Sequence, residues 1–168
     1  MATLAELLAS SLAALKQVQQ SGDFTIVKSG ELSPTHLKRL LANHFLMPVI
    51  KGWYIVTDPR AVPGDSTAWY ASFWNFILRY ATERYGKEWC LSAEQSLAIY
   101  SGSTTVPKQV LIRSPKGNNN SLELLPPTSL FNLEAALPSR IDTDNPYRLN
   151  LYPLAEAIIA ATPAIYKS

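Results

Sequence analysis

The stretch that decides the fold is Leu32–Thr57, with the sequence LSPTHLKRLLANHFLMPVIKGWYIVT. Its first half predicts a helix, because Ser33 can cap the N-terminus and Pro34 is tolerated at the first helical position, where no N–H is needed. Apolar residues then recur at helical spacing. Its second half predicts a tight β-hairpin, since two β-type runs flank Lys51-Gly52 and the favoured two-residue turns need positive φ.

A helix that runs into a hairpin with a basic tip is the sequence outline of a winged helix-turn-helix. In the standard motif a further helix directly precedes the recognition helix. Here Asp23–Gly30 predicts a short strand instead, so that the first half of the motif is shortened or absent. The segment Ala2–Gln20 draws one apolar stripe and predicts an amphipathic helix that packs on this unit.

The polar side chains that lie off the apolar stripe of the expected recognition helix are candidates for DNA contact. Lysine and arginine can bind phosphates, and arginine or asparagine can read purine edges in a major groove. The alternative is an ordinary solvated face, and the sequence leaves both interpretations open. With the hairpin added, the candidate DNA-binding residues are Thr35, His36, Lys38, Arg39, Asn43, Lys51 and Trp53.

A loop at Asp58–Asp65 holds two prolines and a glycine and predicts a domain boundary. We therefore expect a winged-helix-like domain at residues 1–60 and a second domain at residues 65–168. In the second domain we expect strands at Val106–Arg113, Leu122–Leu125 and Tyr147–Tyr152, with a helical turn at Thr128–Leu137. The predicted fold class is α+β, a winged-helix-like unit followed by a small mixed α/β domain.

The segment Ser66–Tyr85 predicts a helix whose aromatic residues cover more than half of its circumference. Such a helix is either the centre of a core or an aromatic face that binds a partner. A polar loop around Asn118–Asn120 offers a second surface for a partner. The candidate partner-binding residues are Trp69, Phe73, Trp74, Lys116 and Asn118.

The composition limits the chemistry that the chain can carry. A net charge of +2 over 168 residues does not predict a nucleic-acid binder, so any basic surface must be local. The single cysteine, Cys90, excludes an internal disulfide framework and favours a cytoplasmic protein with a small apolar filler at this position. His36 and His44 lie two helical turns apart, too far to share one ion, and no metal site or cofactor is predicted. No apolar run is long enough to span a membrane, and no membrane partner is expected.

Four runs carry a resemblance to a known family: LSPTHLKRLLANHFLMPVIKGWYIVTDP (32–59), DSTAWYASFWNFILRYATERYGKEWCLSAEQSLAIYSG (65–102), VPKQVLIRSPKGNNN (106–120) and TSLFNL (128–133). The chain resembles the N-terminal region that precedes the catalytic domain in bacterial Fic-family (cell filamentation) proteins. The likeness extends from about Leu12 to about Pro163. At the level of the fold, the chain is also similar, more loosely, to AbiEi-type antitoxins and transcriptional regulators.

The resemblance implies a regulatory or targeting module that is not an enzyme. Fic catalysis needs an HPFxxGNGR-type loop, and the only histidines, His36 and His44, do not begin such a motif. Two functions follow as hypotheses. The first is an antitoxin-like regulator that binds double-stranded DNA through the winged-helix unit. The second is a protein-interaction module that binds a cognate toxin, a Fic catalytic domain or a foreign complex.

Overall fold

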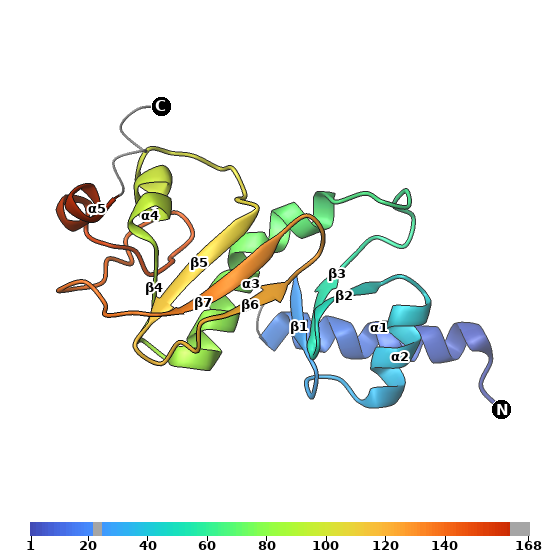
Figure 1. Ribbon diagram of the computed structural model, residues 1–168. Coiled ribbons are helices and arrows are strands. Elements are labelled where there is room, and N and C mark those ends of the chain that lie inside the picture. The colour runs from blue at the N-terminus through green and yellow to red at the C-terminus, as the bar shows by residue number, and fades with distance from the viewer. Residues whose placement is uncertain (22–24, 162–168) are drawn as a thin grey trace. The chain divides into compact units, whose positions relative to one another are not determined.

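The computed structural model describes residues 1–21 and 25–161, which form five helices and two β-sheets (Figure 1). The chain is therefore α+β, as predicted from the sequence. It divides into two compact units, Met1–Phe73 and Trp74–Ser168, and residues 1–60 all belong to the first. Helix α3 (Thr67–Tyr85) begins in the first unit and ends in the second. Among the described residues, no helix combines the length and the apolar character needed to cross a membrane.

The first unit packs two helices on a three-stranded antiparallel sheet. Its elements before α3 are α1 (Leu4–Ser21), β1 (Ile26–Lys28), α2 (Pro34–Ala42), β2 (Leu46–Ile50) and β3 (Trp53–Val56), and the sheet order is β1-β3-β2. The predicted cap forms, because the Ser33 hydroxyl accepts a hydrogen bond from the backbone N–H of His36 at 3.2 Å. The predicted hairpin also forms, and Gly52 supplies the positive φ of +85° that its turn requires.

Strand β2 contains a proline, which is tolerated because β2 pairs only with β3 and lies at an edge of the sheet. The pairing register shifts between Pro48 and Ile50, so the strand carries an irregularity next to the proline. The core of the unit lies between the helices and the sheet. Its buried apolar cluster comprises Leu15, Val27, Leu32, Leu40 and Leu46.

The second unit holds a four-stranded mixed sheet. After α3 come β4 (Cys90–Leu91), α4 (Ala93–Tyr100), β5 (Gln109–Ser114), β6 (Asn120–Glu123), β7 (Ser129–Glu134) and α5 (Leu154–Ala160). The strand order is β4-β5-β7-β6, in which β5 and β7 are parallel and the other pairs are antiparallel. The side chains of Cys90, Ala93, Tyr152, Ala157 and Ala161 form one buried cluster of this unit.

Two predictions for the second unit are wrong. The expected helical turn at Thr128–Leu137 is strand β7, in which Leu130 and Asn132 are buried and their neighbours are half-buried, the period-two pattern of a strand. Among the described residues, the expected strand at Tyr147–Tyr152 forms one isolated bridge, between Leu151 and Asp142, and accepts one backbone hydrogen bond from Leu91 at Asn150, but it joins no sheet. Leu149 and Leu151 of that segment are buried, and this burial explains the alternating sequence pattern. Burial of alternate residues does not require hydrogen bonding to a neighbouring strand.

Strand β7 also carries the buried polar centre of the unit. The Asn132 Nδ2 group donates to the hydroxyl of Tyr80 and to Oδ1 of Asn120, each at 3.1 Å. Its Oδ1 accepts a hydrogen bond from the Tyr85 hydroxyl at 2.8 Å, and Tyr85 in turn accepts from Nε of Arg84. Because buried amides are costly without partners, this network fixes the end of α3 on the sheet.

Candidate nucleic-acid interface on helix α2

Helix α2 presents one outward row of side chains. Thr35, Lys38 and Ala42 follow at positions i, i+3 and i+7, which lie on one face of a helix, and all three are exposed. Asn43, the C-cap residue, is also exposed, and its Nδ2 group donates to the carbonyl of Arg39 at 2.8 Å. Of the predicted residues on α2, the structure thus places Thr35, Lys38 and Asn43 where a ligand can reach them.

The tip of the β2–β3 hairpin presents a second cation. Lys51 is exposed there, and the tip is held in place because the backbone N–H of Ser29 donates to the Gly52 carbonyl at 2.8 Å. A Cβ at Gly52 would lie 3.2 Å from the Ser29 hydroxyl, so this approach is close. Ser29 directly follows β1, so this contact ties the hairpin tip to the end of that strand.

Trp53 does not lie on the surface as predicted. Only 7% of the residue is exposed, and it lies on the central strand β3 between Lys28 of β1 and Ile50 of β2. Lys28, its partner across β1 and β3, places its ammonium group 5.3 Å from the centre of the Trp53 ring. Such a contact stabilises both groups. The sequence analysis missed Lys28 as a cation next to the hairpin, although its position directly after the β-type run could have indicated it.

The side chains of His36 and Arg39 contact α1. The buried hydroxyl of Ser11 lies 2.8 Å from Nη1 of Arg39 and 2.8 Å from Nδ1 of His36. Nη1 of Arg39 also donates to the carbonyl of Leu7 at 3.1 Å. Both residues are half-buried, so their part in the first unit is to join the two helices.

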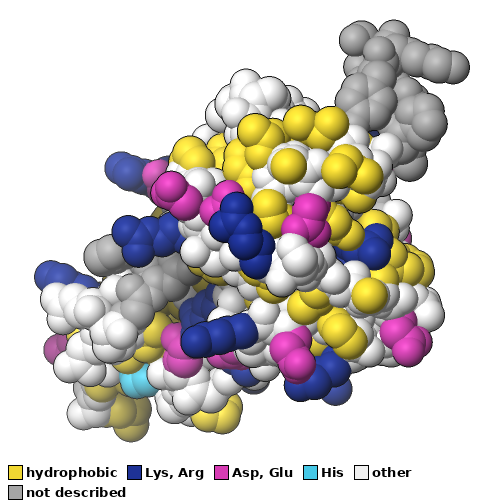
Figure 2. All heavy atoms as spheres, turned by 90° about the vertical axis from the view of Figure 1, so that its left-hand side faces the viewer, with side chains coloured by type: hydrophobic (Ala, Val, Ile, Leu, Met, Phe, Trp, Pro, Cys, Tyr) yellow, Lys and Arg dark blue, Asp and Glu magenta, His cyan; other side chains and the backbone are white. Residues whose placement is uncertain are grey.

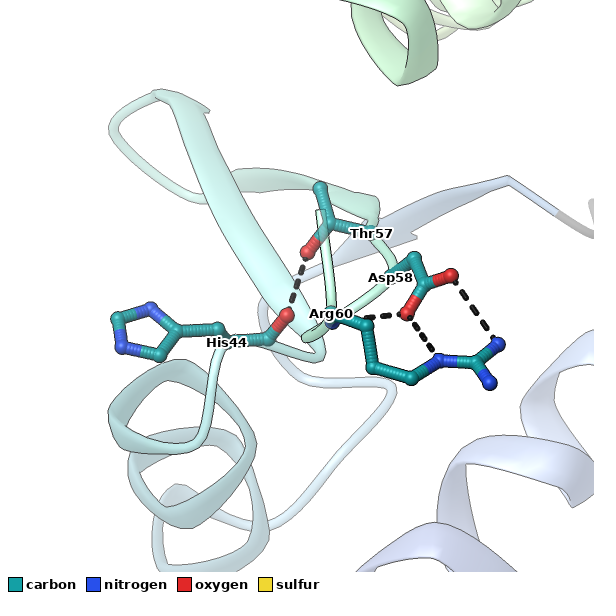
Figure 3. A network of polar contacts seen from close by, with 4 residues as sticks. All are labelled: His44, Thr57, Asp58 and Arg60. Carbon is teal, nitrogen blue, oxygen red and sulfur yellow. Dashed lines mark hydrogen bonds and ion pairs between the residues drawn. The ribbon is translucent and has the colours of Figure 1, made fainter. Parts of the chain in front are cut away.

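The C-terminal end of α2 is closed by a Schellman motif. The N–H of Phe45 donates to Leu40 O and that of His44 donates to Leu41 O, which places His44 at the position usually taken by glycine. His44 has a φ of 63° and an exposed side chain. Its carbonyl accepts a hydrogen bond from the Thr57 hydroxyl at 2.8 Å, while the imidazole points away from this contact (Figure 3).

Arg60, three residues after Thr57, is a cation that is already paired. Nε of Arg60 lies 3.2 Å from Oδ1 of Asp58, and the backbone N–H of Arg60 donates to the same oxygen (Figure 3). The side-chain hydrogen bond from Arg60 lowers the pKa of the Asp58 carboxyl below its ordinary value. The positive charge of Arg60 is balanced by the negative charge of Asp58, so this pair adds little to a basic surface.

The predicted aromatic partner face is part of the core. Trp69, Phe73 and Trp74 are 1%, 0% and 6% exposed, so none of them offers its ring to a partner. The wide apolar coverage of α3 therefore reflects a helix that is packed on several sides. The loop residues Lys116 and Asn118 are exposed, and the ammonium group of Lys116 pairs with the carboxylate of Glu88.

An exposed apolar patch occurs instead on α5. Leu154 and Ile159 are 51% and 84% exposed, and Ile158 is 49% exposed. Figure 2 shows hydrophobic side chains gathered on the face that includes α5, with cations and carboxylates interspersed around them. The sequence analysis treated this segment only as a helix, because its short length gives little periodicity to interpret.

The thiol of Cys90 is buried. Burial raises the pKa of the Cys90 thiol from 9.0 to about 12, which leaves it protonated and unreactive at neutral pH. In the part of the chain that the structure describes, no three His, Cys, Asp or Glu side chains come together as metal ligands.

Comparisons of the chain with protein-family models, with curated proteins and with solved structures give no match. The resemblance to Fic N-terminal regions and to AbiEi-type regulators therefore stays a prediction.

Proposed function

We propose that the first unit is a winged-helix-like module that binds double-stranded DNA, and that the chain is a non-catalytic, antitoxin-like regulator related to the N-terminal regions of Fic proteins. The observation that carries the proposal is the exposed row of α2, which lies in the same small unit as the basic hairpin tip. In this assignment α2 enters the major groove and the β2–β3 hairpin is the wing.

The arrangement of α2 supports this assignment. A single helix fits the major groove of B-DNA, and its outward side chains then meet base edges and phosphates. Lys38 binds a phosphate, and the Thr35 hydroxyl donates to a phosphate or a base edge. Ala42 lies on the same row and can only make apolar contacts, for example with a thymine methyl group.

The hairpin supplies the remaining positive charge. Lys51 at the tip and Lys28, which pairs with Trp53 beside the tip, contact the phosphate backbone in this assignment. Three lysines that neutralise three phosphates predict a slope of about −2.7 for log K against log salt concentration. Binding is therefore expected to be weak at physiological salt and clearly measurable at low salt.

The test is a fluorescence-anisotropy titration of the full chain with labelled duplex DNA at several salt concentrations. One duplex carries the region upstream of the protein's own gene, and a second, unrelated duplex of equal length is the control. The proposal predicts affinity for both at low salt and tighter binding to a specific site. If neither duplex binds at low salt, the proposal is rejected.

A second candidate function is a protein-interaction module that binds a toxin, a Fic catalytic domain or a foreign complex. The apolar patch on α5 supports it, because exposed aliphatic groups that lie together often mark an interaction surface. The test is a binding assay with a purified candidate partner, comparing wild type with Ile159→Asp and with Ala155→Asp on the same helix. Loss of binding in both variants, or in neither, would reject this role for Ile159.

A further inference from the structure

The neighbouring cations of α2 lie in different surroundings, although they look equivalent in the sequence. Lys38 is exposed on the outward row, whereas Arg39 is half-buried and donates from Nη1 to Ser11 Oγ and Leu7 O of α1. Consecutive residues of a helix are separated by about 100° around its axis. Two adjacent side chains therefore cannot both face one ligand surface equally.

The contact around Ser11 has a defined donor and acceptor pattern. A guanidinium group can only donate, so the Ser11 oxygen accepts from Arg39. The single hydrogen of the hydroxyl is then available to His36 Nδ1 when that nitrogen is unprotonated. Ser11 is fully buried, which makes the loss of either bond costly.

We infer that Ser11 and Arg39 are positioning residues that set the rotation of α2 about its own axis, and that they do not contact DNA themselves. His36 and Arg39 lie one turn apart on α2, and Leu7 and Ser11 lie one turn apart on α1, so the anchor joins two turns of each helix. This anchor fixes the face with Thr35, Lys38 and Ala42 outward. The inference rests on the proposed function, because it assigns roles within the same surface.

The experiment measures the salt slope of DNA binding for the full-length variants Lys38→Gln and Arg39→Gln, which remove one positive charge from adjacent positions. The inference predicts that K38Q reduces the magnitude of the slope by about 0.9, the value for one phosphate contact. It predicts that R39Q weakens binding by the same factor at every salt concentration and keeps the wild-type slope. A reduction of about 0.9 in R39Q would overturn the inference, because Arg39 would then be a phosphate contact.

Ser11→Ala provides a second variant that leaves all charges in place. We expect S11A to weaken binding with an unchanged slope, and the double variant S11A/R39Q to lose less affinity than the product of the two single losses. Such non-additivity is expected of residues that act through one contact. Independent losses, or wild-type affinity in S11A, would overturn the inference. Failure of the wild type to bind DNA would instead reject the proposed function, so the two failures are distinguishable.

Discussion

Gly117 lies against the backbone of Leu133, so closely that a Cβ at Gly117 would be 2.4 Å from the Leu133 carbonyl oxygen. The contact arises from the sheet topology, because β7 lies between β5 and β6 and the β5–β6 connection must cross the end of β7. Asn119 completes the crossing, since its N–H donates to Asn132 O and its Oδ1 accepts from the N–H of Glu134.

This contact predicts that Gly117→Ala strongly destabilises the second unit. The obstructing atoms belong to the backbone and cannot rotate away, so we expect a loss of about 3 kcal/mol in the free energy of unfolding. Urea denaturation measures it. Asn118→Ala is the matched control at the exposed neighbouring position, and it should change the free energy by less than about 0.5 kcal/mol. Equal stability of the two variants would contradict the crossing geometry.

The buried network around Asn132 predicts a second large effect. Asn132→Ala removes the partner of the Tyr85 hydroxyl and two bonds of its own amide, and we expect a loss of about 3 kcal/mol. Thermal unfolding followed by circular dichroism measures the loss. Asn120→Ala, which removes one bond at a half-buried position, should cost less. The interpretation fails if N120A is the more damaging variant.

The turn after α2 predicts a stabilising substitution. His44 occupies the glycine position of a Schellman motif with φ of 63°, where a Cβ is strained. His44→Gly relieves this strain, and after the added entropy of glycine in the unfolded chain we expect a gain of about 1 kcal/mol. His44→Ala keeps the Cβ and should show no such gain. A gain in H44A equal to that in H44G would assign the effect to the imidazole.

The Cys90 thiol predicts a loss of stability at high pH. Burial raises its pKa from 9.0 to about 12, so the folded protein keeps a proton that the unfolded chain releases above about pH 9. The contribution is fully present below pH 9 and decreases as the pH rises toward 12. Each pH unit in this window costs up to about 1.4 kcal/mol.

Urea midpoints between pH 8 and pH 11 test this dependence, with Cys90→Ala as the comparison. The pKa of Tyr85 is also raised by burial, and its contribution is common to both proteins. Wild type should therefore lose stability with pH more steeply than C90A. Parallel curves would show that the thiol ionises equally in the folded and unfolded states.

The sequence predicted most of the first unit because its signals are local. The Ser33 cap and the Lys51-Gly52 turn each depend on a few adjacent residues, and both form as expected. Strand β7 was mistaken for a helical turn because a short apolar run such as Leu130–Leu133 has no decisive period. Its pairing with β5 and β6 is a non-local property of the sheet.

The candidate site was predictable only in part, for the same reason. Periodicity separates the polar side of α2 from its apolar side, but it does not show which polar residues α1 will contact. Lys38 and Arg39 are therefore indistinguishable in the sequence, and only the packing of Ser11 against Arg39 separates them. The burial of Trp53 likewise depends on its position in the sheet opposite Lys28.

The central claim is that the outward row of α2 and the hairpin tip bind the DNA backbone. The most direct measurement is the salt dependence of duplex binding by wild type, by Lys38→Gln and by the double variant Lys38→Gln/Lys51→Gln. The account predicts a wild-type slope of about −2.7 that decreases in magnitude by about 0.9 with each lysine removed. A measurable affinity whose slope is the same in all three proteins would contradict it, because the contacts to DNA would then lie elsewhere on the chain.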